Sequence, residues 1–368
     1  MTKYTSHSTR DPILPPGQMP HALSGAAKSA HETLHVFDLP QIHTKPTAKD
    51  LLHALSLLSL QPPSWDDQDK GLKNAHEEGQ ISPEGVPKYL TSIVSNELRW
   101  IKDEAEREQI WDQASLRLAE RSGRTGMPAI SRTFKIPSPT GYVDLTLHEP
   151  SLTEDHLGFK TWASSYMLAK RMCSMDLPSP RNGRHRILEL GSGTGLVGLA
   201  AAAVLKADVL LTDLPEIEGN LSKNVLQNLD ILEFEGGSAT TAVLDWADPR
   251  LVDGSSSVGT NTLASHGPFP IILAADCMYS AEHPALLVNA ITPWLERSPE
   301  ARLVLEIPLR EGHGYEKERQ DLRQRLANLG LEVVDDGEET GYDDWGGVGS
   351  ELQEVPCEWS IWRWKGNS

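Results

Sequence analysis

The chain has 368 residues, a length that fits about two or three domains, and a net charge of −18 from 34 Lys and Arg against 52 Asp and Glu. This acidity argues against direct binding to nucleic acids or to anionic membrane surfaces, because both need a basic face on the protein. Three widely spaced cysteines fit neither a disulfide framework nor a thiolate metal site. No stretch predicts a secretory leader or a membrane span, so we expect a cytoplasmic protein.

Composition divides the chain into three parts. Residues 1–30 are rich in Ser, Pro, Gly and His without periodicity, which predicts a disordered tail. Residues 31–126 predict a mostly helical segment. Residues 127–368 predict a larger α/β domain, interrupted by a Ser/Gly-rich insertion at 253–267 that we expect to be a surface loop.

The helical segment shows three local signals. A short apolar run at 34–40 predicts a strand. Thr47, with Asp50 three residues later, predicts the start of a helix, although Asp replaces the usual Glu of such a cap. Apolar residues spaced by three and four over 83–121 predict one long amphipathic helix or two consecutive helices.

The α/β domain is expected to begin with a β-hairpin, formed by two extended runs around the turn-like residues 138–141. Apolar strands then alternate with helices, which predicts a mostly parallel, doubly wound sheet. The predicted strands of this sheet are 185–190, 207–215, 240–246, 269–279, 301–309, 331–336 and 357–365.

The strongest motif is the glycine loop at 186–195, Arg-Ile-Leu-Glu-Leu-Gly-Ser-Gly-Thr-Gly. Glycines let the chain turn tightly, and the helix that follows offers free backbone N–H groups to a ligand. Two cofactor classes fit this pattern. A dinucleotide needs G-x-G-x-x-G, which Gly193, Gly195 and Gly198 match, whereas S-adenosylmethionine needs an acid before G-x-G-x-G, which Glu189 supplies.

Residues at the ends of later strands favour S-adenosylmethionine. Asp213 ends the second strand and can accept hydrogen bonds from a ribose in either cofactor class. Trp246 ends the third strand, where its ring can stack on an adenine. Asp276 and Tyr279 follow an apolar fourth strand, and a polar pair there is costly to bury without a partner.

The segments ELGSGTGLVG, TDLPE, LDW and AADCMY, with LGFKTWASSYMLAKRM upstream, resemble the seven-stranded protein-lysine methyltransferases of methyltransferase family 16. The resemblance covers roughly residues 140–368. It implies an α/β fold with a Rossmann-like seven-stranded class I methyltransferase sheet whose last strand is antiparallel, preceded by an N-terminal helical extension and the β-hairpin. Residues 127–368 would then be the S-adenosylmethionine-dependent methyltransferase domain. The N-terminal helical segment is similar to fungal members that methylate translation elongation factor 2 on lysine.

The resemblance also assigns roles to individual residues. It implies S-adenosyl-L-methionine as cofactor and elongation factor 2 as the protein partner. Two residues, Asp276 and Tyr279, would be catalytic and face the target lysine. The residues implied to contact the cofactor are Trp162, Gly191, Ser192, Gly193, Asp213, Trp246 and Ala275. We expect no metal, because the histidines show no metal-binding spacing.

The chemistry requires a neutral amine, whereas free lysine has a pKa of about 10.4. An ionised Asp276 stabilises the ammonium form, so we assign Asp276 to binding and orienting the lysine, and not to a general base. Tyr279 would form a wall of the lysine channel. The acidic run at 335–344 is expected to be a solvated loop, with a docking surface for a basic substrate as the second interpretation.

Three other functions fit parts of the pattern. The first is a small-molecule methyltransferase on the same fold. The second is an NAD-dependent oxidoreductase, against which stand the acid before the first glycine and the absence of an obvious catalytic pair. The third is a catalytically silent interaction module, which the intact glycine loop and the Asp276/Tyr279 pair argue against.

Overall fold

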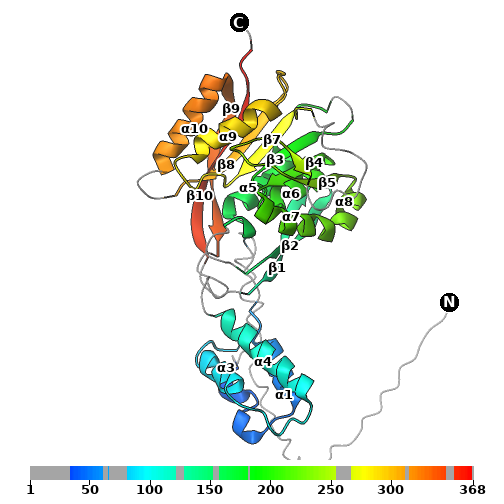
Figure 1. Ribbon diagram of the computed structural model, residues 1–368, viewed down its shortest axis with the longest axis vertical. Helices are drawn as coiled ribbons and strands as arrows, with labels where there is room; N and C mark the ends of the chain where they lie inside the picture. The colour runs from blue at the N-terminus through cyan, green and yellow to red at the C-terminus, as the bar shows by residue number, and fades with distance from the viewer. Residues whose placement is uncertain are drawn as a thin grey trace, which may run out of the picture.

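The structure is a computed structural model that describes residues 34–60, 65, 81–121, 128–151, 157–180, 183–253, 267–310, 315–344 and 352–366. The expected tail at 1–30 and most of the insertion at 253–267 lie outside these ranges. Figure 1 shows a helical unit at one end of the molecule and a larger sheet domain at the other.

The helical unit contains α1 (Ala48–Leu57), α3 (Val86–Val94) and α4 (Glu104–Ala119). The cap of α1 is confirmed: Thr47 accepts the backbone N–H of Asp50, and the carboxylate of Asp50 accepts that of Thr47. The periodic stretch forms two helices, because the chain leaves the helical conformation between α3 and α4, where Leu98 has φ +49°. The apolar faces of the three helices pack against one another in a core of their own.

The strand predicted at 34–40 is wrong. Val36–Asp38 form a short 3-10 helix, η1, and His35 caps it by accepting the backbone N–H of Phe37 while Asp38 accepts the N–H of His35. These local side-chain bonds give the backbone an alternative to an extended ladder. In this run, Leu34 forms an isolated bridge to Ile81.

The predicted hairpin is confirmed as β1 (Ile130–Ser138) and β2 (Gly141–Glu149), paired antiparallel. Within the described residues the main sheet has seven long strands and the two-residue edge strand β6 (Val252–Asp253), in the order β6-β5-β4-β3-β7-β8-β10-β9. The long strands are β3 (Arg186–Leu190), β4 (Asp208–Asp213), β5 (Ser238–Val243), β7 (Ile271–Ala275), β8 (Arg302–Pro308), β9 (Leu331–Asp343) and β10 (Gln353–Trp364). The central strands pair in parallel, and β10 is antiparallel to both of its neighbours, as expected.

Helices cover both faces of the sheet (Figure 1), because its central strands are apolar on both sides. The hairpin packs on the first face together with α5 (Ala163–Arg171), α6 (Leu196–Leu205), α7 (Pro215–Gln227) and α8 (Leu229–Glu235). The second face is covered by α9 (His283–Trp294) and α10 (Tyr315–Leu329). None of the helices described is long and apolar enough to cross a bilayer.

The acidic run at 335–344 is not a loop, because most of it lies in β9 at the edge of the sheet. Charged side chains are well tolerated on an edge strand, where they also discourage pairing with other chains. Basic side chains of the same chain pair with four of its acids: Arg323 with Asp336, Arg171 with Glu339, Lys160 with Asp343, and Arg132 with Asp344. These pairs argue against the run acting as one docking surface for a basic substrate.

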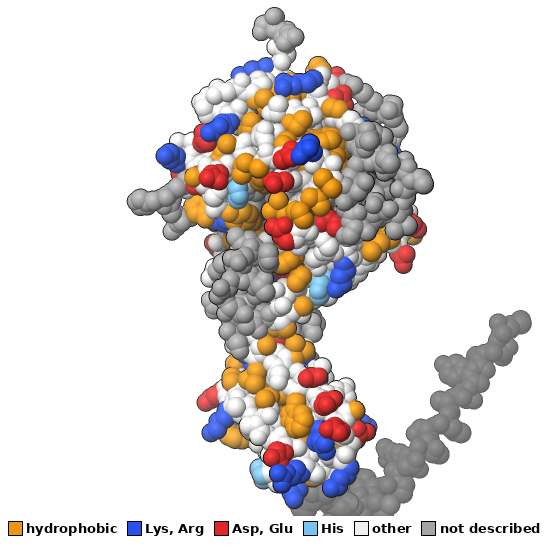
Figure 2. Space-filling model, in the orientation of Figure 1, with side chains coloured by type: hydrophobic (Ala, Val, Ile, Leu, Met, Phe, Trp, Pro, Cys, Tyr) orange, Lys and Arg blue, Asp and Glu red, His pale blue; other side chains and the backbone are white. Residues whose placement is uncertain are grey.

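Acidic and basic side chains are interspersed on the face of the molecule that Figure 2 shows, over the helical unit as well as the sheet domain. The net charge of −18 is therefore not gathered into a single acidic patch on this face. A mixed surface of this kind favours solubility.

Trp65 follows the helical segment's first helix in the chain but packs in the sheet domain. It is 4% exposed, and its ring centroid lies 5.5 Å from that of Phe134 on β1 and 6.0 Å from that of Tyr166 on α5. The guanidinium of Arg132 lies 4.8 Å from the same ring. Trp65 therefore ties the N-terminal part of the chain to the hairpin and to the helix that precedes the sheet.

Replacing Trp65 with alanine should destabilise the sheet domain by about 3 kcal/mol or more, because truncating a buried Trp leaves a cavity. The thermal unfolding midpoint measures this effect. Phe37 is the matched control, since it is 79% exposed and its replacement with alanine should change stability by less than about 0.5 kcal/mol. Equal midpoints for the two variants would contradict the anchoring role of Trp65.

Candidate functional site

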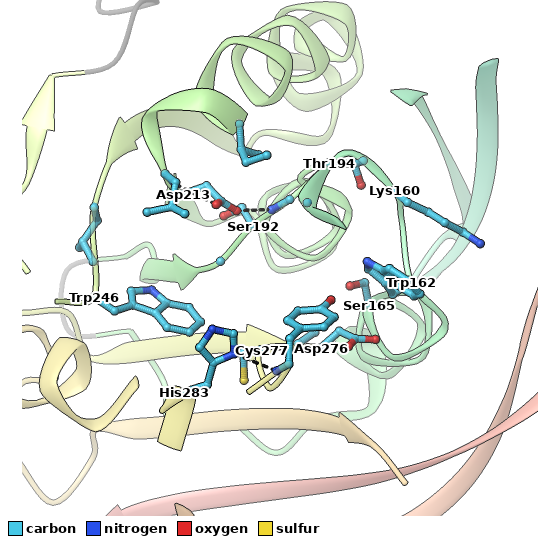
Figure 3. A pocket seen from close by; sticks show the side chains of 18 of the residues that line it. Lys160, Trp162, Ser165, Ser192, Thr194, Asp213, Trp246, Asp276, Cys277 and His283 are labelled. Carbon is cyan, nitrogen blue, oxygen red and sulfur yellow. Dashed lines mark hydrogen bonds between the residues drawn. The ribbon is translucent and has the colours of Figure 1, made fainter. Parts of the chain in front are cut away.

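A cavity of about 340 Å³ opens at the carboxyl ends of β3, β4, β5 and β7, the edge where parallel sheets bind ligands (Figure 3). The structure places every site residue predicted from the sequence on the wall of this one cavity. They are Trp162, Gly191, Ser192, Gly193, Asp213, Trp246, Ala275, Asp276 and Tyr279.

The glycine loop between β3 and α6 forms the floor of the cavity. Gly191 and Gly193 have φ of +67° and +55°, a region that residues with a Cβ rarely adopt. A Cβ at Gly191 would lie 2.9 Å from the ring of Trp246, and one at Gly193 would lie 3.1 Å from the carbonyl oxygen of Gly158. Both positions therefore need glycine for backbone conformation and for space.

The side chains of Glu189 and Ser192 hold this loop in place by hydrogen bonds. Glu189 is 2% exposed, and its carboxylate accepts the backbone N–H of Gly198 at 3.1 Å, inside α6. The hydroxyl of Ser192 accepts the backbone N–H of Thr212 on β4 at 3.0 Å. Burial raises the pKa of Glu189 to about 8. Glu189 does not line the cavity. The acid of the glycine motif therefore stabilises the loop from the side that faces away from the cavity.

Asp213 lies at the end of β4 and points into the cavity (Figure 3). Its two carboxylate oxygens accept the backbone N–H groups of Gly193 at 2.7 Å and Leu214 at 2.8 Å. Burial raises the pKa of Asp213 to about 6, and these two hydrogen bonds oppose the rise. A carboxylate oxygen has a second lone pair, so Asp213 can also accept hydrogen bonds from ligand hydroxyls.

His283 orders the side of the cavity opposite the glycine loop. Its Nδ1 accepts the backbone N–H of Tyr279 at 2.8 Å, and its ring lies edge-on to those of Tyr279 and Trp246, at 6.0 and 5.9 Å. Burial lowers the pKa of His283, which favours the neutral form that an accepting Nδ1 requires. His283 therefore holds the two aromatic walls in place.

Asp276 follows β7 and has φ +48°, an unusual conformation for a residue other than glycine. Its side chain is buried. Ser164 donates to one carboxylate oxygen at 2.9 Å, and Nη2 of Arg310 donates to the other at 2.6 Å. Burial raises the pKa of Asp276, and the guanidinium of Arg310 opposes that rise. Such over-determined, strained residues concentrate at functional sites.

A second, more open cavity of about 530 Å³ meets the first one. Trp162, Asp276 and Tyr279 line both cavities. The rings of Trp162 and Tyr279 lie 6.1 Å apart. Ligands in the two cavities would therefore share these three side chains, which suits a transfer reaction between the ligands.

Several residues at the site were not anticipated from the sequence: Lys160, Ser164, Ser165, Cys277, His283 and Arg310. Arg310 stands two residues after β8, so the rule that ligands bind at the carboxyl ends of parallel strands could have found it. His283 carries no such signal. In the part of the chain that the structure describes, no three His, Cys, Asp or Glu side chains are arranged to hold a metal ion.

A sequence model of a family described as lysine methyltransferase matches residues 142–318. The chain is 32% identical over 338 residues to the protein-lysine N-methyltransferase rrg1 of Schizosaccharomyces pombe, covering 89% of this chain and 98% of rrg1. It is 36% identical over 289 residues to the protein-lysine N-methyltransferase EFM2 of Saccharomyces cerevisiae, covering 73% of this chain and 64% of EFM2. The chain therefore belongs to the lysine methyltransferase family.

Members of this family use S-adenosylmethionine, and the enzyme is a methyltransferase that depends on it. The first cavity fits this group. Its volume is in the range of small-molecule sites, Gly191 and Gly193 leave room that a Cβ would fill, and Asp213 presents a carboxylate where ribose hydroxyls can donate.

Replacing Gly191 with alanine should weaken S-adenosylmethionine binding about ten-fold or more, because the new Cβ pushes the ring of Trp246 into the cavity. Gly236 is the matched control: its φ is +88°, but nothing lies within 4 Å of a Cβ built there. Both variants should lose about 1–2 kcal/mol of stability from backbone strain. Calorimetric titration should show weaker binding for the Gly191 variant alone. Equal losses of affinity in the two variants would contradict the need for glycine at position 191 to leave room for the cofactor.

S-adenosylmethionine binding should depend on pH through Asp213. The ionised carboxylate is the better acceptor, and its pKa is raised to about 6, so affinity should fall as the pH drops from 7 to 5. Asp213→Asn cannot titrate, and it should bind more weakly with a flat pH dependence over that range. A wild-type affinity that does not change between pH 7 and 5 would rule out this role for Asp213.

Proposed function

We propose that this enzyme methylates a lysine side chain of translation elongation factor 2, in the cytoplasm. One observation carries the choice of substrate: the N-terminal helical segment resembles fungal members that act on elongation factor 2. The alignment with rrg1 supports the use of this segment, because it takes in 89% of the chain and so extends well beyond the matched segment 142–318. The cytoplasm is the location expected from the sequence.

The two adjoining cavities support separate binding sites for the cofactor and for the target lysine. We assign the first cavity to S-adenosylmethionine, held by the residues predicted for that purpose: Trp162, Gly191, Ser192, Gly193, Asp213, Trp246 and Ala275. We assign the second cavity to the target lysine, which would reach the cofactor between Trp162 and Tyr279 and beside Asp276. Residues 31–126 would contact the protein substrate, and residues 127–368 would form the methyltransferase domain.

Asp276 and Tyr279 are the proposed catalytic residues. When bound, S-adenosylmethionine supplies a methyl group already activated by a positively charged sulfur, so positioning of the amine is the main task of the protein. Asp276 would orient the lysine nitrogen through its buried carboxylate. Burial keeps the pKa of Tyr279 well above 10, so its hydroxyl stays protonated and can bond the amine while the ring walls the channel. The lysine proton would leave to water.

The experiment is methyl labelling. The purified protein and methyl-labelled S-adenosylmethionine are added to an extract of Saccharomyces cerevisiae that lacks EFM2, and the products are separated by size. We expect one labelled protein with the mass of elongation factor 2. With Asp276→Ala the label should fall about ten-fold or more, while the calorimetric affinity for S-adenosylmethionine stays unchanged, because that side chain positions the lysine.

Asp276→Asn is the isosteric control for this experiment, since it keeps the shape of the side chain and removes its charge. Label in a different protein would contradict elongation factor 2 as the substrate. Label in small molecules alone would contradict protein methylation. Full turnover by Asp276→Ala would remove Asp276 from the catalytic residues.

A further inference from the structure

Arg310 lines the second cavity and lies beside Asp276, which lines both cavities. It follows β8, and its guanidinium Nη2 lies 2.6 Å from Oδ1 of Asp276. The Asp276 side chain is 4% exposed and that of Arg310 is 23% exposed, so the pair is largely shielded from water. An ion pair with so little solvent contact acts strongly on any charge brought beside it.

Aromatic rings hold the guanidinium in this position. It lies 5.4 Å from the ring centroid of Trp162, 5.0 Å from that of Tyr279 and 5.7 Å from that of Tyr315 at the start of α10. Planar guanidinium groups stack well on such rings, so the position of Arg310 is fixed on several sides.

The lysine has to lose a proton before it can accept a methyl group. A buried, ionised carboxylate beside its nitrogen would favour the ammonium form and raise the pKa of the lysine. Taken alone, Asp276 therefore orients the lysine and at the same time keeps it unreactive. A second charge of opposite sign next to Asp276 removes this conflict, because the net charge of the pair is zero.

Other ionisable groups that face this pair are already neutral or paired. Asp343 and Asp344 from β9 are paired with Lys160 and Arg132. Glu306 on β8 has Arg171 beside it. Burial raises the pKa values of the thiols of Cys277 and Cys357, so both stay uncharged at neutral pH. Glu354 on β10 lines the second cavity but is exposed, where water screens its charge.

We propose that Arg310 is a positioning residue that neutralises Asp276, so that the target lysine loses its proton readily in the site. This inference rests on the proposed lysine methylation. The ammonium proton passes to water, the nitrogen lone pair forms the new N–C bond, and the C–S bond breaks with its electron pair left on sulfur. Asp276 thus orients the amine through a hydrogen bond without stabilising its charged form.

Arg310 remains in place while the lysine is bound. An incoming lysine ammonium could replace Arg310 beside Asp276 only by exchanging one cation for another. This exchange brings no gain in electrostatic stabilisation of Asp276. The exchange would also break the contacts of Arg310 with three aromatic rings. Arg310 stays protonated at every accessible pH, so its effect on the lysine is constant.

The test is the pH dependence of kcat for methylation of purified elongation factor 2, at saturating S-adenosylmethionine, because kcat reports ionisations in the substrate complex. In Arg310→Gln the acidic limb of the profile should move up by about one pH unit or more, since an opposite charge at this range shifts a pKa by about 1–3 units. At high pH, kcat should return to within a few-fold of the wild-type value. Arg310→Lys should keep the wild-type limb.

Arg319→Gln is the matched control, since it removes an arginine from another partly buried ion pair, with Glu358, away from both cavities. It should leave the profile unchanged. Loss of kcat by one factor at all pH values would show a merely structural role for Arg310. A lower KM with no shift in the acidic limb of the kcat profile would show that Arg310 obstructs entry of the target lysine. Either result overturns the inference, whereas absence of lysine methylation by the wild-type enzyme overturns the proposed function and this inference together.

Discussion

The backbone of the glycine loop has to lie between two neighbouring strand ends, and buried polar side chains keep it there. Glu189 holds the start of α6, Ser192 holds β4, and Asp213 reaches back from β4 to the loop. Each bond satisfies a backbone N–H group that would otherwise be unpaired near the cavity floor. The loop held in this way lies so close to Trp246 that a Cβ at Gly191 would lie 2.9 Å from its ring.

Several buried charges around the site are paired with a charge of opposite sign. Lys160 and Arg132 are matched with two acids at the end of β9, and Asp276 is matched with Arg310. Breaking such a pair leaves an uncompensated buried charge, which is costly. The first cavity nevertheless keeps an excess of acids, since Asp213, Glu216, Asp245 and Asp276 line it together with Lys160. An acidic lining suits a cofactor that carries a positive charge.

The sequence predicted most of the fold because its signals were local. Strand–helix alternation, the Thr47 cap and the glycine loop each depend on residues close together in the chain, and strand ends in parallel sheets lie at a common edge. This rule alone predicts that Asp213, Trp246 and Asp276 lie at one cavity.

The parts that the sequence did not reveal depend on distant partners. Trp65 packs on β1 and α5 across a long stretch of chain, and Arg310 meets Asp276 across 34 residues. An isolated Arg after an apolar strand resembles any solvated surface residue. High charge density is typical of loops, so the sequence predicts a loop at 335–344. The position of this segment at the sheet edge makes a charged strand stable instead.

Strand β10 lies between β8 and β9, although it is synthesised after both. The two earlier strands therefore cannot reach their final spacing until β10 has left the ribosome and inserted between them. Glu354, Val355 and Pro356 of β10 also form one wall of the second cavity. A nascent chain can form the first cavity from strands made earlier, but it gains the complete second cavity only with this late insertion. The two cavities at the site are therefore completed at different stages of folding.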